Sequence, residues 1–294
     1  MRQPLTGYGG RKWLCAIAVN LFLQSAGLSV SAQVVTLSNL DSTATVNLGS
    51  GGSLGMTNWF VGGVNNLAQQ WFWYRVGSSG PEQPITAIGG LTFNQPDSRT
   101  LNATYFNGQY GVTINYLLTG SQVVNSYSSA DISESITITN ATTSPLSFHF
   151  FQYADLDLAG SATGDTVALG KNLRGLYNEA DQSKSGSIDT AFTLTVVTNP
   201  ANHGEAGLNN STLARLSDGN TDNLNDNVGP LTGDSTWALQ WDFTIPAASS
   251  VGIVQDKYLL NTPPDFPEPS PLSLVSLGLI GFALRKRRLS QAGH

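Results

Sequence analysis

Apolar and polar residues alternate in short runs through the middle of the chain, and each run ends at residues typical of turns. In residues 132–139, Ile136 and Ile138 alternate with serine and threonine. A period of two places successive side chains on opposite faces of a strand, so this run predicts a strand with one buried face. Residues 70–76 read Gln-Trp-Phe-Trp-Tyr-Arg-Val. So dense an aromatic run predicts a strand covered on both faces.

The same patterns predict at least ten strands and no long helix. Asn107 and Gly108 lie between two aromatic-containing runs, and this dipeptide favours a type I′ hairpin because both residues tolerate a positive φ. The expected strands are residues 43–48, 58–64, 70–76, 85–93, 100–106, 109–118, 122–128, 132–139, 146–153, 191–198, 237–245 and 251–260.

Many short strands with turns about every 8–12 residues, and no internal repeat, predict an all-β fold. We expect a single antiparallel β-sandwich, jelly-roll-like or larger, over residues 33–262, a length that one such domain can have. Two long polar sections, 155–187 and 199–234, interrupt the strand pattern. Loops of this length in a compact domain are usually functional or disordered.

The N-terminal residues have the three parts of a secretory signal peptide. Basic residues come first, apolar residues follow at 13–19 and 21–23, and small residues precede the expected cleavage between Ala32 and Gln33. We therefore expect residues 1–32 to be removed by signal peptidase and the protein to be exported. Cys15 is the only cysteine of the chain. The mature protein therefore has no disulfide, no thiolate nucleophile and no cysteine metal ligand.

Residues 33–262 are strongly acidic. They hold seven Lys and Arg against eighteen Asp and Glu, a formal charge of −11, whereas the whole chain has −6 because both ends are basic. Nucleic acid is disfavoured as a partner, since its binding depends on basic contacts to phosphates. Cations remain possible ligands.

The C-terminal residues 263–294 carry three features in a fixed order. Prolines recur from 263 to 271, an uncharged apolar segment covers 272–284, and a basic cluster follows. Prolines favour an extended spacer, and basic residues after an apolar segment favour the cytoplasmic side of a membrane. The apolar segment is shorter than the roughly 20 residues of a usual span. A buried core helix, the alternative, does not account for the flanking prolines and the basic cluster.

This order resembles the PEP-CTERM sorting signal of Gram-negative bacteria. The residues that carry the resemblance are Pro267, Glu268, Pro269, Arg285, Lys286, Arg287 and Arg288. The resemblance implies that an exosortase, a membrane-embedded cysteine transpeptidase, cuts near the motif. The protein would then be anchored in the inner membrane before processing and reach the cell surface or the extracellular matrix afterwards. The ectodomain is similar to uncharacterised PEP-CTERM proteins, a similarity that implies no activity.

Two aspartates at the end of a predicted strand are candidate calcium ligands. Asp155 and Asp157 are two positions apart, so both side chains can project from one face, and Asp165 could join them. Like charges this close need a cation or solvent. Two interpretations stay open, a calcium site or a solvated strand end.

Two loops also carry oxygen ligands at alternating positions. From Asp181 to Asp189 they have the spacing of an EF-hand loop, but Phe192 stands where the bidentate Glu belongs, and no helix flanks the loop. Turns that satisfy their own backbone have the same composition. The second loop carries Asp218, Asn220, Asp222 and Asp226.

Catalytic candidates are few. Residues 51–55 match the Gly-x-Ser-x-Gly pattern, but a true nucleophile elbow leads into a helix, and none is predicted here. His149 and His203 are the only histidines of the mature domain, and two histidines make no zinc site without a third ligand. A carboxylate pair such as Glu134 with Asp155 would suit glycoside hydrolysis, but no sequence feature selects it.

Five tryptophans of the domain could stack on sugar rings, although stripes on strands are usually buried. They are Trp59, Trp71, Trp73, Trp237 and Trp241. We expect a non-enzymatic structural or carbohydrate-binding component of exopolysaccharide or biofilm, with calcium as the one candidate cofactor. The alternative is a secreted carbohydrate-active hydrolase with acidic catalytic residues between 155 and 234.

Overall fold

The residues whose structure is described here all lie in one of the two units of the chain. The chain divides into two units, Met1–Val30 and Ser31–His294, and every described residue lies in the second unit. In the computed structural model, the described residues are 33–49, 53–125, 127–186 and 188–262.

The predicted sorting signals at both ends fall outside these ranges. Ala32, the Pro-Glu-Pro residues 267–269 and the basic cluster 285–288 are not among the described residues, whereas Gln33 lies just before the first strand. The apolar segment 272–284 is likewise not described. Within the part that the structure describes, no helix has the length and apolar character needed to cross a membrane.

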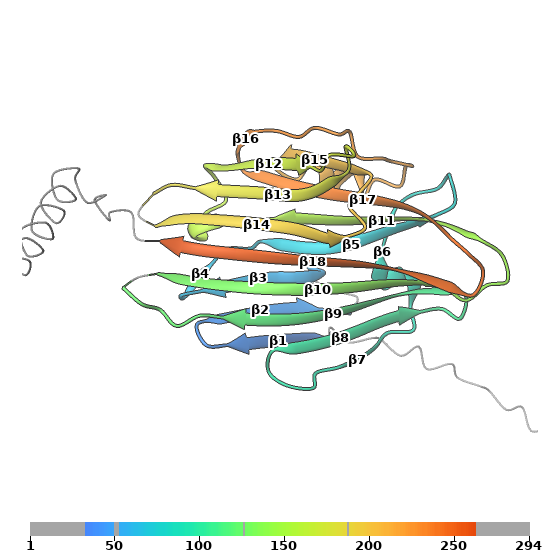
Figure 1. The fold of residues 1–294 in the computed structure, drawn as a ribbon, viewed down its shortest axis with the longest axis horizontal. Coiled ribbons are helices and arrows are strands. Elements are labelled where there is room, and N and C mark those ends of the chain that lie inside the picture. Colours follow the sequence, from blue (N-terminus) through green and yellow to red (C-terminus); the bar gives the residue numbers. More distant parts are fainter. Residues whose placement is uncertain (1–32, 50–52, 126, 187, 263–294) are drawn as a thin grey trace, which may run out of the picture. The chain divides into compact units, whose positions relative to one another are not determined.

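The described residues form two antiparallel sheets of nine strands each (Figure 1), which confirms the all-β prediction. The first sheet has the order β1 (Val34–Asn39), β2 (Ser42–Asn47), β3 (Gly55–Val61), β5 (Gln69–Val76), β11 (Leu146–Asp155), β17 (Ser235–Ile245), β15 (His203–Leu208), with β4 (Val64–Asn65) on β3 and β6 (Gln83–Pro84) on β5. The second sheet has the order β16 (Leu231–Gly233), β12 (Asp165–Lys171), β13 (Tyr177–Lys184), β14 (Asp189–Thr198), β18 (Ser249–Thr262), β10 (Ser128–Asn140), β9 (Tyr110–Gly120), β8 (Thr100–Phe106), β7 (Thr92–Asn94). The short helical elements are η1 (Ile85–Ile88), η2 (Leu158–Gly160) and α1 (Ser211–Arg215).

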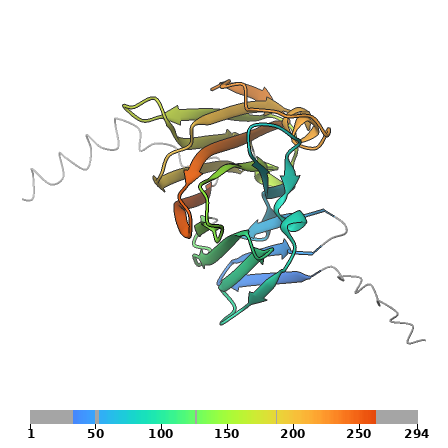
Figure 2. The same cartoon turned by 90° about the vertical axis from the view of Figure 1, so that its right-hand side faces the viewer.

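The two sheets face each other across one hydrophobic core (Figure 2). On β10, Ile132, Ile136 and Ile138 are fully buried, while the intervening serines and threonines are partly exposed. Phe192 of the second sheet meets Trp59 of the first edge to face, with ring centres 6.4 Å apart. Burying side chains of this size stabilises the fold by about 1.5–3 kcal/mol each.

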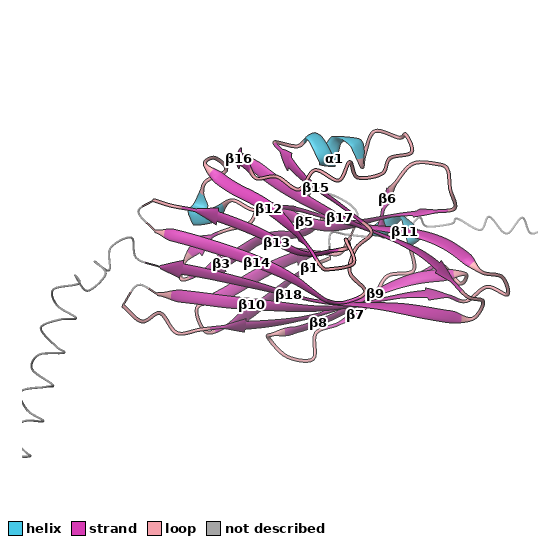
Figure 3. Cartoon of the chain, turned by 45° about the horizontal axis from the view of Figure 1, so that its top comes forward, coloured by secondary structure: helices cyan, strands magenta, loops and turns pink. Residues whose placement is uncertain are grey.

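Strand β5 is buried on both faces, as its aromatic run predicted. On the core side, Phe72 stacks on Phe150 of β11 with ring centres 5.3 Å apart. Trp73 and Arg75 lie on the opposite face, which α1 and the residues after it cover near β15 and β17 (Figure 3). This cover explains how a sheet can bury aromatic residues on its outer side.

Two predicted strands are wrong. Residues 85–93 begin with η1 and turn at Gly89, whose φ of 78° breaks an extended run. Residues 122–128 form the connection between β9 and β10, apart from Ser128, which begins β10. In it, Val124 and Tyr127 make an isolated bridge.

The predicted hairpin between residues 100 and 120 is confirmed, but its turn is not type I′. Gly108 has a positive φ of 91° and Asn107 does not. Instead, Oδ1 of Asn107 accepts hydrogen bonds from the backbone N atoms of Gln109 and Tyr110, at 2.9 and 3.0 Å. The asparagine therefore stabilises the turn through hydrogen bonds of its side chain and not through a positive φ.

The two long polar sections contain strands that the sequence pattern missed. Strands β12 and β13 lie within residues 155–187, and β15 and β16 lie within residues 199–234. Polar side chains at the inward positions hid the alternation. On β13, for example, the inward residue Gln182 is buried and donates a hydrogen bond to the carbonyl of Leu156, 3.0 Å away.

Candidate functional site

Three carboxylates come together where β11 ends and β17 begins. Asp155 is the last residue of β11, Asp157 follows it closely, and Asp234 directly precedes β17. Because Asp155 lies opposite Thr236 in the register of these strands, their pairing brings Asp234 to the other two. One oxygen of each carboxylate lies within 4.8 Å of the others. The sequence identified Asp155 and Asp157 as candidates but not Asp234, because strand pairing was needed to find it.

The electrostatics of this cluster disfavour three free negative charges. Burial, followed by the charges of Asp157, Asp234 and Asp165, raises the pKa of Asp155 to about 7. Burial and the charge of Asp234 also raise the pKa of Asp157, against the opposing effect of Lys184. A bound cation would relieve this repulsion, and carboxylate oxygens are the ligands that calcium prefers.

Two polar atoms beside the cluster are buried without a hydrogen-bond partner among the described residues. They are Oδ1 of Asp155 and the hydroxyl oxygen of Tyr153, although the Thr236 side chain lies close enough to the Tyr153 hydroxyl to lower its pKa slightly. Tyr153 is fully buried, and burial together with the charges of Asp155 and Asp234 raises the pKa of its hydroxyl. A buried polar atom without a hydrogen bond lowers the stability of the fold unless a ligand or a water molecule supplies the bond.

Asp165, the third aspartate considered from the sequence, is occupied by protein partners. Its Oδ2 accepts hydrogen bonds from the backbone N of Leu158 at 3.3 Å and from Gln182 at 3.1 Å, and its Oδ1 lies 3.3 Å from Nζ of Lys184. Asp165 thus supplies charge near the cluster without joining the three carboxylates.

The candidate loop from Asp181 to Asp189 is a β-hairpin. Asp181 lies within β13 and accepts a hydrogen bond from Oγ1 of Thr193, 2.8 Å away. Asp189 begins β14 and accepts a hydrogen bond from the backbone N of Gly186 at 3.0 Å. Of the described residues, this hairpin supplies no group of three converging metal ligands.

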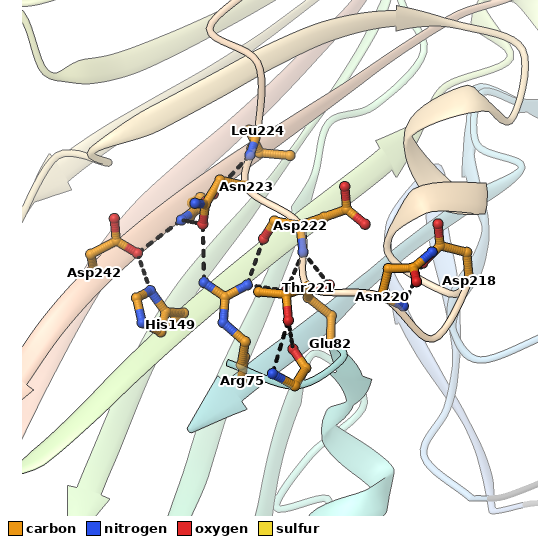
Figure 4. A network of polar contacts seen from close by, with 12 residues as sticks. Arg75, Glu82, His149, Asp218, Asn220, Thr221, Asp222, Asn223, Leu224 and Asp242 are labelled. Carbon is orange, nitrogen blue, oxygen red and sulfur yellow. Dashed lines mark hydrogen bonds and ion pairs between the residues drawn. The ribbon is translucent and has the colours of Figure 1, made fainter. Parts of the chain in front are cut away.

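The second candidate loop lies over the outer face of the first sheet, and its polar side chains point to different partners (Figure 4). Asp218 accepts a hydrogen bond from the backbone N of Asn220 at 2.7 Å. The backbone N of Asp222 donates to the carboxylate of Glu82, 3.2 Å away, and Asp226 contacts a histidine. Among the described residues, the three aspartates of this loop do not form a group of converging carboxylates.

A buried arginine holds this loop to the sheet (Figure 4). Arg75 on β5 forms an ion pair with Glu82, and both side chains are almost fully buried. Arg75 also donates to the carbonyl of Asp222 at 2.5 Å and to Oδ1 of Asn223 at 3.0 Å. Gln240 on β17 completes the network through Asn223, 2.9 Å away. No local pattern in the sequence indicates this network, because its members come from four separate segments.

Both histidines of the described residues lie in one row with two aspartates. Nδ1 of His149 lies 2.5 Å from Oδ1 of Asp242, and Nε2 of His203 lies 3.5 Å from the other oxygen of that carboxylate. Nδ1 of His203 in turn lies 3.0 Å from Asp226. Asp242 is a residue that the sequence did not single out. Among the described residues, these four side chains do not form a group of three converging metal ligands.

All five tryptophans of the domain are buried, which confirms the burial expected for most of them. Trp73 nevertheless lines two adjoining grooves of about 440 and 310 Å³ beside α1. Leu54 and Ser217 line both grooves, and Gln69 and Asn210 add amide groups to the larger one. A lining that combines an aromatic ring with amide groups suits the apolar faces and the hydroxyl groups of a sugar.

The remaining catalytic candidates do not form a catalytic arrangement. Strand β3 rather than a helix follows Ser53, so the Gly-x-Ser-x-Gly match is not a nucleophile elbow. Glu134 is fully buried in the core and forms an ion pair with Lys257. It therefore cannot face Asp155 as one of two carboxylates in an open cleft.

Comparison of the sequence with protein-family models finds one match, the PEP-CTERM protein-sorting motif at residues 267–288. This agrees with the resemblance seen in the sequence. No curated protein matches the sequence.

Comparison with solved structures finds several enzymes of low sequence identity. A putative aldose 1-epimerase from Escherichia coli K12 has 10% identity and a TM-score of 0.49, covering 79% of this chain and 100% of that chain. A bacterial glucoamylase complexed with acarbose has 11% identity and a TM-score of 0.47, covering 84% of this chain and 36% of that chain. A GalM/aldose epimerase homologue from C. elegans has 10% identity and a TM-score of 0.40, covering 80% of this chain and 100% of that chain. Likenesses at this level establish no activity.

Proposed function

We propose that this chain, which carries a PEP-CTERM protein-sorting motif at residues 267–288, is an exported bacterial protein that an exosortase delivers to the cell surface or extracellular matrix. The motif is the observation that carries the proposal. It follows a described β-rich part that ends at Thr262. The acidic charge of residues 33–262 and their lack of cysteine suit a protein that works outside the cell.

The test of this proposal is the C-terminus of the protein released from the cell surface. We expect mass spectrometry to find a C-terminus near Pro267, and we expect the precursor to accumulate in membranes of cells that lack the exosortase. A surface protein that still ends at His294 in cells with the enzyme would contradict the proposal.

We further propose that the domain is a non-enzymatic structural or carbohydrate-binding component of the matrix polysaccharide. The groove beside α1 supports this role, because Trp73 and two amide side chains line it. Ser217 is exposed and lines both parts of the groove, so Ser217→Arg should block it without disturbing the core. We expect this variant to lose binding to purified matrix polysaccharide in calorimetry while keeping its melting temperature. Unchanged binding would exclude this groove.

The proposed ligand of the carboxylate cluster is calcium. Asp155, Asp157 and Asp234 would hold the ion, and its charge would stabilise the ends of β11 and β17 by offsetting their repulsion. A cation bound here would stabilise the domain without taking part in catalysis, so the cluster is compatible with a structural role.

The same cluster supports a second candidate function, a carbohydrate-active hydrolase. A carboxyl group with a pKa of about 7 beside other carboxylates resembles the general acid of glycoside hydrolysis, whose pKa is also raised by its surroundings. The two functions differ in one measurement. A hydrolase would release reducing sugars from the matrix polysaccharide and lose this activity in Asp155→Asn, whereas a structural module would release none.

A further inference from the structure

Three exposed apolar side chains lie at the tips of two neighbouring loops. Leu40, in the turn between β1 and β2, is 66% exposed, and Val123 and Val124, in the loop between β9 and β10, are 54% and 58% exposed. The backbone N of Asp41 donates to the carbonyl of Ser121, 3.2 Å away, so the two loops are joined. These tips form one apolar projection.

The fold gains nothing from apolar residues at these positions. Leu40 has a φ of 51°, a left-handed conformation that favours Gly or Asn over residues with a large side chain. The valines are held in place, because the backbones of Val124 and Tyr127 exchange two hydrogen bonds of 3.0 and 2.9 Å. Backbone hydrogen bonds hold these loops in place, and the leucine and the two valines remain exposed. Exposed apolar side chains held in this way point to a role in binding.

The same end of the sheets is the one at which the described chain leaves the domain. Strand β18 ends at Thr262, and Asn261 pairs with Ser128, the first residue of β10. The end of β18, the β9–β10 loop and the β1–β2 turn lie together on the left of Figure 1. Nine residues lie between Thr262 and the start of the apolar segment at Leu272, so the ten steps from one Cα atom to the next limit the distance between the two to about 36 Å.

We propose that the apolar projection formed by Leu40, Val123 and Val124 docks into the surface of the lipid bilayer that holds the sorting segment. The inference rests on the proposed sorting by the C-terminal motif. Before cleavage the short link keeps this end of the domain beside the membrane, and aliphatic tips can enter the headgroup boundary by about 5–10 Å. The docked domain would hold the sequence around Pro267 at the depth where a membrane-embedded enzyme can reach it.

A bilayer fits this surface better than a protein partner does. The three aliphatic tips, together with the partly exposed Tyr127 of the β9–β10 loop, offer too little area for a stable protein interface, which buries upwards of about 1,000 Å². The formal charge of −11 on residues 33–262 would repel an anionic lipid surface. The contact must therefore be apolar, and we expect salt, which screens the repulsion, not to weaken it.

Single-cysteine labelling tests the proposal in the full chain. Cys15 is the only cysteine, so Cys15→Ser provides a background without thiols, into which Val124→Cys is introduced. Leu173→Cys is the matched control, because Leu173 is fully exposed in the turn between β12 and β13, at the opposite end of the second sheet. Each chain carries an environment-sensitive fluorophore and is reconstituted into phosphatidylethanolamine–phosphatidylglycerol vesicles that contain nitroxide-labelled lipids.

We expect the label at position 124 to shift to shorter wavelength and to be quenched several-fold more strongly than the label at position 173. Introducing Val123→Asn and Val124→Asn should abolish quenching of a third label at Leu40→Cys, and circular dichroism should show the fold intact. Equal quenching at 124 and 173 in a chain that floats with the vesicles would overturn the docking proposal alone. A chain that does not float would overturn the membrane anchoring on which both proposals depend.

Discussion

Nζ of Lys257 donates a hydrogen bond to Oε1 of Gln70, 2.7 Å away, and this bond crosses the core from the second sheet to the first. Lys257 also forms an ion pair with Glu134 on the neighbouring strand β10, and both side chains are almost fully buried. Burial lowers the pKa of Lys257, and the charge of Glu134 opposes this effect. The core therefore contains a polar link whose members depend on one another.

The first prediction concerns this ion pair. Glu134→Ala leaves the charge of Lys257 buried without its partner and should lower the free energy of unfolding by about 3–5 kcal/mol. The double variant Glu134→Leu and Lys257→Met should be clearly more stable than Glu134→Ala, because it removes both charges. Urea denaturation measures the difference. Ser135→Ala on the outer side of β10 is the control and should change stability by less than about 0.5 kcal/mol. A double variant as unstable as the single one would contradict the prediction.

The alternation of inward and outward residues along β10 and β18 already indicates this buried link. Glu134 occupies an inward position between Ile132 and Ile136, and Lys257 lies two positions from the inward Leu259. A charged residue on the apolar face of each of two strands indicates a buried pair. The partner strand could not be identified, because β10 and β18 are far apart in the sequence and pair only in the sheet.

The candidate site shows the same limit. The strand-end spacing identified Asp155 and Asp157, whereas Asp234 and Asp242 depend on the pairing of β11 with β17. Local composition is also a poor guide here, since sections rich in Asn, Asp and Ser predict loops although β12, β13 and β15 lie in them. Alternation is a reliable sign only where the inward residues are apolar.

The second prediction concerns pH and calcium. The folded state raises the pKa of Asp155 from 3.8 to about 7. The stability that this shift contributes is therefore complete below about pH 4 and lost as the pH rises through about 7. In a chelator, the melting temperature should fall between about pH 4 and 7, and Asp155→Asn should reduce this fall. Calcium at a hundred times its Kd should restore about 2.7 kcal/mol at pH 8 in the unaltered protein.

Asp131 provides a matched control for the calcium prediction. Burial and the neighbouring Asp256 raise its pKa to about 7 as well, but Asp131 is not part of the group of three carboxylates. Asp131→Asn should therefore change the pH profile and keep the calcium response, whereas Asp155→Asn should lose it. A melting temperature of the unaltered protein that millimolar calcium leaves unchanged would rule out the calcium site.

The third prediction concerns the arginine under the second candidate loop. Arg75→Ala leaves the fully buried carboxylate of Glu82 without its cation and should cost about 3–5 kcal/mol of stability. Arg75→Lys should recover only part of this loss, because one ammonium cannot reproduce the fork of donors to Glu82, Asp222 and Asn223. Thermal denaturation provides the comparison. Arg174→Ala, at an exposed position, should change stability by less than about 0.5 kcal/mol, and an equal loss from both alanine variants would refute the argument.

The fourth prediction concerns Glu205, which holds α1 on the sheet. Its carboxylate accepts a hydrogen bond from Oγ1 of Thr212 at 2.6 Å and from the backbone N of Asn225 at 3.0 Å, and it forms an ion pair with Arg215. Glu205→Ala removes all three contacts and should cost about 2–3 kcal/mol, since hydrogen bonds to a charged group are among the stronger ones.

The loss should be local to α1 and the residues after it, because the strands on either side of Glu205 keep their pairing. Hydrogen exchange should therefore accelerate from Ser211 to Asn225 and stay unchanged in β10. Because α1 forms one wall of the groove beside Trp73, the same variant should also bind matrix polysaccharide more weakly. Glu205→Gln keeps the shape and some hydrogen bonds, so it should show a smaller effect on both measurements. Faster exchange in α1 with unaltered polysaccharide binding would show that this wall takes no part in recognition.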